Sequence, residues 1–302
     1  MQDQIPNRPI AAASAMLVSM LVIGFIDNFI YGIAGTIGLW QFFVLRMICA
    51  LPLIWMLSRI GLGQIVPLRW VRVAARSFFV ASALLFYFGA LAFMPIAQAL
   101  AGLFTSPIFV LLIGWGVMGQ RIGPWRVVAV ALGFGGILLV LQPDSGAFSW
   151  VTLMPVFGGF LYALGALATR HWCAGESTVA MLGGVMMMQG MIGAVALAVL
   201  GLFGLPVAEG ADGFITRGWV WEMGGIWHLI ALQVVGSVGG VFLIIKSYQL
   251  GEPSYVAVFE YSIMIFGPMF AWLLFGQTLG PIQGIGIALI ALAGIIIAVR
   301  SA

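Results

Sequence analysis

The chain has 302 residues, of which 63% are hydrophobic and 7% are charged, and its mean hydropathy is +1.17. Soluble proteins carry about 25% charged residues, so this composition excludes an ordinary soluble domain and indicates a chain surrounded by lipid. The net charge of +3 comes from short loops between apolar runs, which is not the pattern of a nucleic-acid-binding protein. We therefore expect the lipid bilayer as a partner, and we interpret the first apolar run as a membrane span, not a signal peptide.

Ten apolar segments are each long enough to cross a bilayer, which takes about 20 residues. Backbone that faces lipid must be hydrogen-bonded internally, so each segment is predicted to be a helix. Most connections are short, which makes consecutive helices antiparallel neighbours, whereas residues 204–226 predict an exposed loop. The predicted spans are residues 11–34, 39–58, 71–93, 96–118, 124–141, 149–169, 178–203, 227–248, 254–275 and 281–299.

The basic residues are distributed unevenly between the connections. With the N-terminus in the cytoplasm, ten basic residues lie at or near the inner side, Arg217 alone lies outside, and Arg46 lies within a span. Because cytoplasmic loops carry an excess of lysine and arginine, this bias predicts that both termini are cytoplasmic in a cell inner membrane. The ten inner residues are Arg8, Arg59, Arg69, Arg72, Arg76, Arg121, Arg126, Arg170, Lys246 and Arg300.

One sequence pattern occurs twice in the chain. Residues 94–143 and 251–300 each contain two apolar segments joined by a short turn, and their matching residues are offset by 157. A repeat of about half the chain length indicates two copies of one structural unit. The matching pairs are Trp115 and Trp272, Gly119 and Gly276, Gln120 and Gln277, Gly123 and Gly280, and Pro124 and Pro281.

The charges of the repeated turn indicate that the two copies are inverted. The turn at 120–126 carries two arginines and is predicted to lie inside, whereas its counterpart at 277–283 carries none and is predicted to lie outside. Related sequences on opposite sides of the membrane are what two inverted halves require. The halves are predicted to be residues 1–143 and 144–302, with five helices each.

These paired blocks resemble the ten-helix EamA transporters of the drug/metabolite transporter superfamily. The resemblance extends from the first span to the last, and residues 103–110 and 257–265 resemble the family's fourth and ninth spans. Residues 25–46 resemble the start of its metabolite-uptake branches, which include S-adenosylmethionine and riboflavin transporters. The resemblance implies an all-α integral membrane protein, with two inverted five-helix repeats around a central cavity. It does not identify the transported molecule.

Three charged residues lie well inside the spans, where a charge costs at least ~2.5 kcal/mol and usually faces a cavity or a partner. Asp27 and Arg46 flank a tight turn at similar depth, and we expect them either to pair or to form an outer gate, with Arg46 able to anchor a substrate anion. Glu260 lies about six residues into the ninth span, where a desolvated carboxyl group can exchange protons or bind a cation. Alternatively, Glu260 pairs with Lys246, which otherwise extends to the inner interface.

Prolines are expected to interrupt two spans, at Pro107 and Pro268, because proline frees a backbone carbonyl group. Broken helices near the midplane indicate a transporter site, although packing alone is the alternative. The predicted substrate-binding or coupling site consists of Asp27, Gln41, Arg46, Tyr87, Gln98, Thr105, Ser106, Tyr162, Gln189, Gln233, Glu260 and Tyr261.

The sequence contains no catalytic or metal-ligating constellation and no nucleotide-binding Gly-Lys-Ser/Thr loop, so we expect no enzyme, metal or cofactor. The leading hypothesis is a secondary transporter that moves a small polar metabolite, such as an amino acid, amine or nucleoside-like compound, by alternating access. Proton coupling, exchange or the substrate's own gradient would drive a monomer or homodimer. The alternative is a membrane-embedded scaffold, receptor or enzyme without transport.

Overall fold

The computed structural model describes residues 8–90, 96–141, 153–203, 206–207, 210–276, 278 and 280–300. Within these ranges the regular elements are helical. Nine of the helices described are long and apolar enough to cross a membrane, and Pro124–Val140 is a shorter apolar helix. The predicted all-α membrane fold is therefore confirmed, and each predicted span corresponds to one helix or to a pair of shorter ones.

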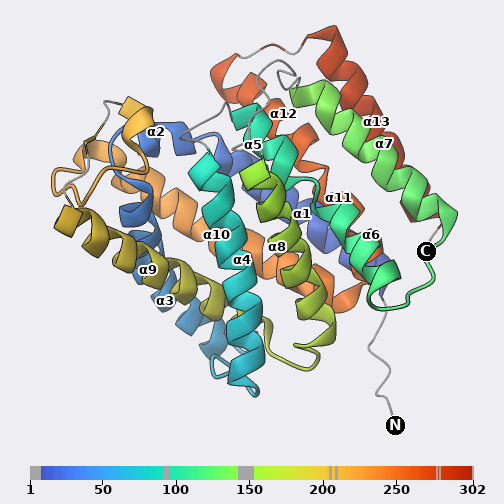
Figure 1. The fold of residues 1–302 in the computed structure, drawn as a ribbon, viewed down its shortest axis with the longest axis horizontal. Helices are drawn as coiled ribbons and strands as arrows, with labels where there is room; N and C mark the ends of the chain where they lie inside the picture. Colours follow the sequence, from blue (N-terminus) through green and yellow to red (C-terminus); the bar gives the residue numbers. More distant parts are fainter. Residues whose placement is uncertain are drawn as a thin grey trace.

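The helices follow the predicted order along the chain (Figure 1). The first five spans are α1 (Pro9–Asp27) with α2 (Ile30–Ala34), α3 (Leu39–Arg59), α4 (Trp70–Ala90), α5 (Ile96–Leu103) with α6 (Ser106–Gly116), and α7 (Pro124–Leu141). The next five are α8 (Leu153–His171), α9 (Thr178–Phe203), α10 (Trp227–Leu250), α11 (Pro253–Glu260) with α12 (Ile263–Phe275), and α13 (Pro281–Arg300). Two short 3-10 turns, η3 (Gly210–Gly213) and η4 (Gly224–Ile226), lie between α9 and α10.

Helices from the first five spans pack mainly against helices from the last five. The main pairs are α1 with α10, α3 with α9, α4 with α8, and α7 with α13, the last pair lying side by side in Figure 1. Glycines permit a close approach in the first pair, because a Cβ atom at Gly236 or Gly240 of α10 would come within 2.5 Å of Ile26 or 2.7 Å of Ile23. This Gly-x-x-x-Gly pair therefore allows α1 and α10 to pack closely.

Two spans break at equivalent positions of the repeat. The break between α5 and α6 is at Phe104–Thr105, and the break between α11 and α12 is at Tyr261–Ser262, which is 157 residues later. The hydroxyl groups of Thr105 and Ser262 each donate to the carbonyl oxygen three residues earlier, at 2.6 Å and 2.7 Å. Each hydroxyl group thus adds a second hydrogen bond to a carbonyl oxygen that already accepts the backbone amide of the same residue, at 3.1 Å in both breaks.

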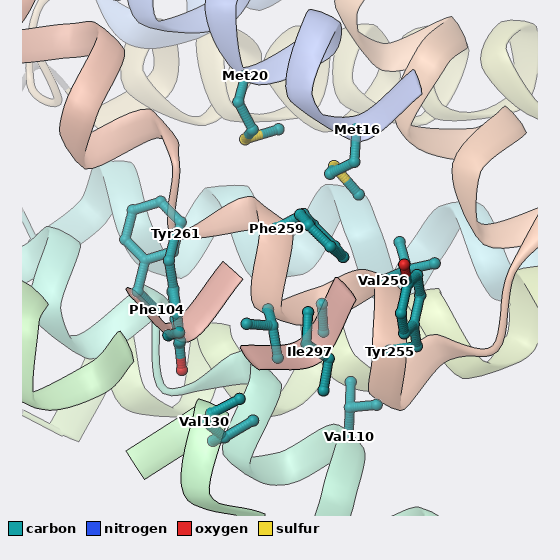
Figure 2. Packing of buried hydrophobic residues seen from close by; sticks show 14 of the residues in the cluster. Met16, Met20, Phe104, Val110, Val130, Tyr255, Val256, Phe259, Tyr261 and Ile297 are labelled. Atoms are coloured by element: carbon teal, nitrogen blue, oxygen red, sulfur yellow. The ribbon is translucent and has the colours of Figure 1, made fainter. Parts of the chain in front are cut away.

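The two breaks meet inside the protein. The rings of Phe104 and Tyr261 contact each other edge to face, with centroids 6.5 Å apart (Figure 2). Both rings belong to a hydrophobic cluster that α1, α6, α7, α11 and α13 also supply. A second cluster is built mainly from α3, α9 and α10.

Only one of the two prolines marks a break. Pro107 lies in the first turn of α6, directly after the break, as predicted. Pro268 lies inside α12, so the prediction that it interrupts the ninth span is wrong. The helix α12 continues through Pro268. The ninth span breaks instead at Tyr261–Ser262, where the Ser262 hydroxyl group donates to the carbonyl oxygen of Phe259.

A third break divides the first span, which the sequence predicted to be continuous. The helix α1 ends at Asp27 and α2 begins at Ile30. The side-chain amide of Asn28 lies in this break and donates to the carbonyl oxygens of Gly24, at 2.7 Å, and Gly267, at 3.3 Å. The break therefore packs against α12 of the other half.

The described part of the predicted exposed loop, residues 210–226, folds onto the start of α3. The Gln41 side chain donates to the carbonyl oxygen of Val220 at 2.7 Å and accepts from the Val220 amide at 2.9 Å. Arg217 donates to the carbonyl oxygen of Ala34 at 2.8 Å, and Phe214 is buried. The described part of the loop is therefore exposed in part, as at Trp221 and Glu222, while these hydrogen bonds fix it to the start of α3.

Four connections lie at one end of the bundle, the end at which α1 begins and α13 ends (Figure 1), and these connections and the helix ends beside them carry Arg59, Arg69, Arg72, Arg121, Arg126 and Arg170. We call this end the basic end and define it by residues 60–69, 117–126, 172–177 and 251–252. Its loops are joined to one another. The Glu176 carboxylate accepts from the backbone amides of Leu68 and Arg69, at 2.9 Å and 2.7 Å, and Arg126 forms an ion pair with Glu252 at 2.6 Å.

Candidate functional site

A central cavity lies between the helices of the two halves. Its wall is mostly apolar and aromatic, with a small set of polar side chains, which is the usual character of a small-molecule site. The polar side chains come from both halves and include four charged ones. They are Asp27, Arg46, Arg76, Tyr87, Ser106, Tyr162, Gln189, Gln233, Ser237, Tyr248 and Glu260.

The structure brings together eight of the twelve residues predicted from the sequence. The eight that line the cavity are Asp27, Arg46, Tyr87, Ser106, Tyr162, Gln189, Gln233 and Glu260. The side chain of Gln98 lies outside the described part of the structure. The lining does not include Gln41, Thr105 or Tyr261, so placing them at the cavity was wrong.

Local contacts explain the position of these three residues. Gln41 binds the loop at Val220, and Thr105 bonds to its own helix. The ring of Tyr261 packs against Gly133 of α7, where a Cβ atom would collide with it. These three residues stabilise the fold around the site and do not line the cavity.

Glu260 is the last residue of α11 and is only 2% exposed. Its Oε1 atom accepts hydrogen bonds from the hydroxyl groups of Tyr248, at 2.7 Å, and Tyr162, at 3.0 Å. Lys246 is exposed and forms no ion pair with Glu260, so the alternative of a Glu260–Lys246 pair is wrong. Two neutral donors from α8 and α10 therefore hold the buried carboxyl group.

Asp27 and Arg46 both face the cavity but do not form the ion pair that the sequence suggested. The helix α10 packs against both α1 and α3 and holds each of them separately. The Nε atom of Arg46 donates to the Ser237 hydroxyl group at 3.0 Å, and the Gln233 amide donates to the carbonyl oxygen of Ile26 at 2.5 Å. Similar depth in adjacent spans was thus not sufficient for contact.

Three polar residues of the cavity were missed by the sequence analysis, namely Arg76, Ser237 and Tyr248. Arg76 was assigned to the inner side, but it is 3% exposed and donates to the Thr169 hydroxyl group at 2.9 Å and the Met181 carbonyl oxygen at 3.4 Å. Its position six residues inside α4 was a usable signal, because that depth matches the depth of Glu260.

Gln189 of α9 differs from the other polar residues of the cavity wall. It is 1% exposed, and neither its amide nitrogen nor its amide oxygen has a hydrogen-bond partner among the described residues. Gln233 has the same side chain in the same wall, but its amide is bonded to α1. Buried polar groups are nearly always partnered, so the Gln189 amide requires an explanation beyond packing.

The fold and the cavity define a multi-pass helical membrane protein, with charged residues placed at the ends of broken helices around a central site. Intramembrane charges and interrupted helices in this arrangement are typical of solute transporters. The model of the EamA-like transporter family matches residues 10–142 and 148–300, so the chain belongs to this family. The family consists of transporters, and its two-repeat fold agrees with the breaks described above.

Three relatives are named for the molecules that they transport. The chain is 28% identical to a riboflavin transporter of Rhizobium johnstonii and 26% identical to one of Vibrio cholerae, over 68% and 66% of this chain and 63% and 61% of the relatives. It is 22% identical to an S-adenosylmethionine uptake transporter of Rickettsia bellii, over 64% of this chain and 62% of that protein. The chain thus spans slightly less than two thirds of the length of these relatives.

A solved crystal structure shows the same fold. The TM-score is 0.74 at 18% sequence identity, and the match covers 94% of this chain and 96% of the other.

Proposed function

We propose that this protein is a secondary transporter that moves a small polar metabolite across the inner membrane by alternating access. Its two inverted halves would be residues 1–143 and 144–302, in accord with the two separate matches of the family model. The observation that carries the proposal is the central cavity, which both halves line and in which polar side chains lie beside broken helices. An amino acid, an amine or a nucleoside-like metabolite suits such a wall. The relatives named for riboflavin and S-adenosylmethionine support this range.

Glu260 is the proposed coupling residue. A carboxylate inside a membrane protein is costly unless hydrogen-bond donors compensate it, and Tyr162 and Tyr248 supply two donors in this state. These tyrosines belong to α8 and α10, whereas Glu260 ends α11, so relative movement of these helices would separate donors from acceptor. Loss of the donors favours the neutral form and therefore proton uptake.

The contacts at the basic end would close the cavity on that side during the transport cycle. The Arg126–Glu252 ion pair and the hydrogen bonds from the Leu68 and Arg69 amides to Glu176 join the two proposed halves across this end. Halves that rock about a central site must break such contacts when the cavity opens on this side. The Arg126 and Glu252 side chains are 16% and 31% exposed, and ion pairs that water reaches contribute only about 0–1 kcal/mol, so this pair can separate at modest cost. Glu176 is buried, so breaking its two hydrogen bonds costs more.

The experiment is uptake by purified protein in liposomes, with riboflavin, S-adenosylmethionine, amino acids, amines and nucleosides supplied as a mixture and identified by mass spectrometry. At least one of these compounds should enter protein-containing liposomes in a saturable manner. Protein-free liposomes, and liposomes with the Arg126→Cys, Glu252→Cys variant locked by a thiol crosslinker, are the controls. Equal entry into all three kinds of liposome would contradict the proposal.

A further inference from the structure

Four charged side chains line the cavity, and two of them already have their partners in the protein. Glu260 accepts from two tyrosine hydroxyl groups, and Arg76 donates to Thr169 and to the Met181 carbonyl oxygen. The other two, Asp27 and Arg46, face the same cavity without contacting each other. They are the charges that remain available to a ligand.

Asp27 presents its carboxylate to the cavity. It is exposed although it lies inside a span, and it forms no hydrogen bond or ion pair with another described residue. It is also the last residue of α1, so the carbonyl end of a half-helix lies beside the carboxylate. The negative end of the helix dipole and the carboxylate charge both favour a bound cation.

Arg46 presents the opposite charge. Its described hydrogen bond is donated by Nε to Ser237 at 3.0 Å, so its two terminal nitrogens have no hydrogen-bond acceptor in the described protein. The guanidinium carbon lies 5.9 Å from the centroid of the Phe42 ring, which fixes the plane of the group further. A guanidinium group held through Nε keeps its remaining N–H groups for a carboxylate, which it binds with two parallel hydrogen bonds.

The helix α10 sets the distance between the two charges. Its Gln233 holds the end of α1 next to Asp27, and its Ser237 holds Arg46. Gln233 and Ser237 are four residues apart and therefore lie on one face of α10, separated by about 6 Å along its axis. The two anchors on α10 are thus about one helical turn apart, and both charges face the cavity.

We propose that Asp27 and Arg46 form a head-group site for a zwitterion, in which Asp27 binds the ammonium group and Arg46 binds the carboxylate of an α-amino acid. This inference rests on the proposed function and narrows its substrate class. A zwitterion compensates both charges, an amine compensates only one, and a neutral molecule compensates neither. The rest of the substrate would lie against Leu84, Tyr87 and Phe88, which continue the same wall.

The test uses the unaltered protein first. Thermal stabilisation of the detergent-purified protein is measured with L-phenylalanine, L-methionine and S-adenosylmethionine, and with the N-acetyl and the carboxamide derivatives of the first two. At least one zwitterion should bind, and capping either end should weaken that binding at least tenfold. Equal binding of capped and uncapped forms, or no binding of any of the three zwitterions, overturns the proposal.

Two variants then assign the ends of the ligand. Asp27→Asn should weaken binding of the zwitterion at least tenfold but leave the binding of its N-acetyl form unchanged, because that form has no ammonium group. Arg46→Gln should also weaken binding of the zwitterion at least tenfold but leave the binding of its carboxamide form unchanged, because that form has no carboxylate. Riboflavin is the neutral comparator for transport. If riboflavin or another non-zwitterion is transported while no zwitterion binds, the inference fails and the transporter proposal stands, whereas absence of any transport contradicts both.

Discussion

We predict that replacing glutamine by leucine has opposite effects on stability at the two glutamines of the cavity wall, Gln189 and Gln233. Gln189→Leu removes an amide that is buried without a partner, at nearly constant side-chain volume. Burial of an unpartnered amide costs ~1–3 kcal/mol in proteins, so the variant should gain about 1 kcal/mol in the free energy of unfolding. Gln233→Leu removes the hydrogen bond to the Ile26 carbonyl oxygen and should lose about 1 kcal/mol.

The protein supplies its own reporter for this comparison. Cys173 is buried and Cys49 is exposed, so a thiol-reactive dye added to a Cys49→Ser background reports unfolding through Cys173. The unfolding temperature of Gln189→Leu should exceed that of the background protein, and that of Gln233→Leu should fall below it. Uptake should nevertheless decrease in Gln189→Leu, because a residue kept for substrate contact is costly to stability and useful to function.

The result that would refute this reasoning is a lower unfolding temperature for Gln189→Leu. That outcome would show that the amide has a structural partner, and Gln189 would then be a packing residue like Gln233. A more stable variant with unchanged uptake would remove Gln189 from the substrate site but leave the stability argument intact.

Three further predictions follow from the inverted halves and the carboxyl site. Cysteines at Arg121 and Thr278, in a chain without the native cysteines, should react with membrane-impermeant reagents from opposite sides; reaction from one side would reject the inversion. A short thiol crosslinker between cysteines at Arg126 and Glu252 should stop uptake, and cleaving it should restore uptake; continued uptake after complete crosslinking would show that the basic end need not open. Tyr248→Phe, which removes the 2.7 Å bond to the buried carboxyl group, should lower stability by about 1 kcal/mol in the thiol-dye assay, and an unchanged unfolding temperature would show that this bond contributes nothing.

Composition and repetition carried the prediction of the fold. The apolar composition of ten segments was sufficient to place the spans, because lipid leaves few alternatives to a helix. The offset of 157 between the matching turns also relates the two helix breaks, although the sequence analysis assigned those breaks to prolines. The expectation that proline breaks the helix failed at Pro268, which lies inside α12. The break lies between α11 and α12, where the Ser262 hydroxyl group donates to the carbonyl oxygen of Phe259.

The depth of a residue along its span predicted which charged residues line the cavity, but it did not predict which residues they contact. Depth along a span identified Asp27, Arg46 and Glu260, all of which line the cavity. It could not show that α10 packs against both α1 and α3 and holds each separately, so it could not decide between an Asp27–Arg46 pair and two separate charges at the cavity. Tyr248 was missed for the same reason, because nothing near it in sequence shows that its hydroxyl group reaches Glu260.

The orientation of Gln41 shows a further limit of sequence reasoning. A glutamine in a span is expected at a cavity or between helices, yet this one binds a loop 179 residues later in the chain. Short sequence patterns do not encode such distant backbone contacts. They became visible only after the helices were packed.

The most direct test of the account is counterflow in liposomes, with and without a pH gradient, for the parent protein and Glu260→Gln. The parent protein should exchange labelled substrate for unlabelled substrate across the membrane and should accumulate it when a pH gradient is applied. Glu260→Gln should retain exchange but lose the accumulation, because the amide cannot carry a proton. Absence of counterflow in the parent protein would contradict alternating access, and gradient-driven accumulation by Glu260→Gln would contradict the assigned role of Glu260.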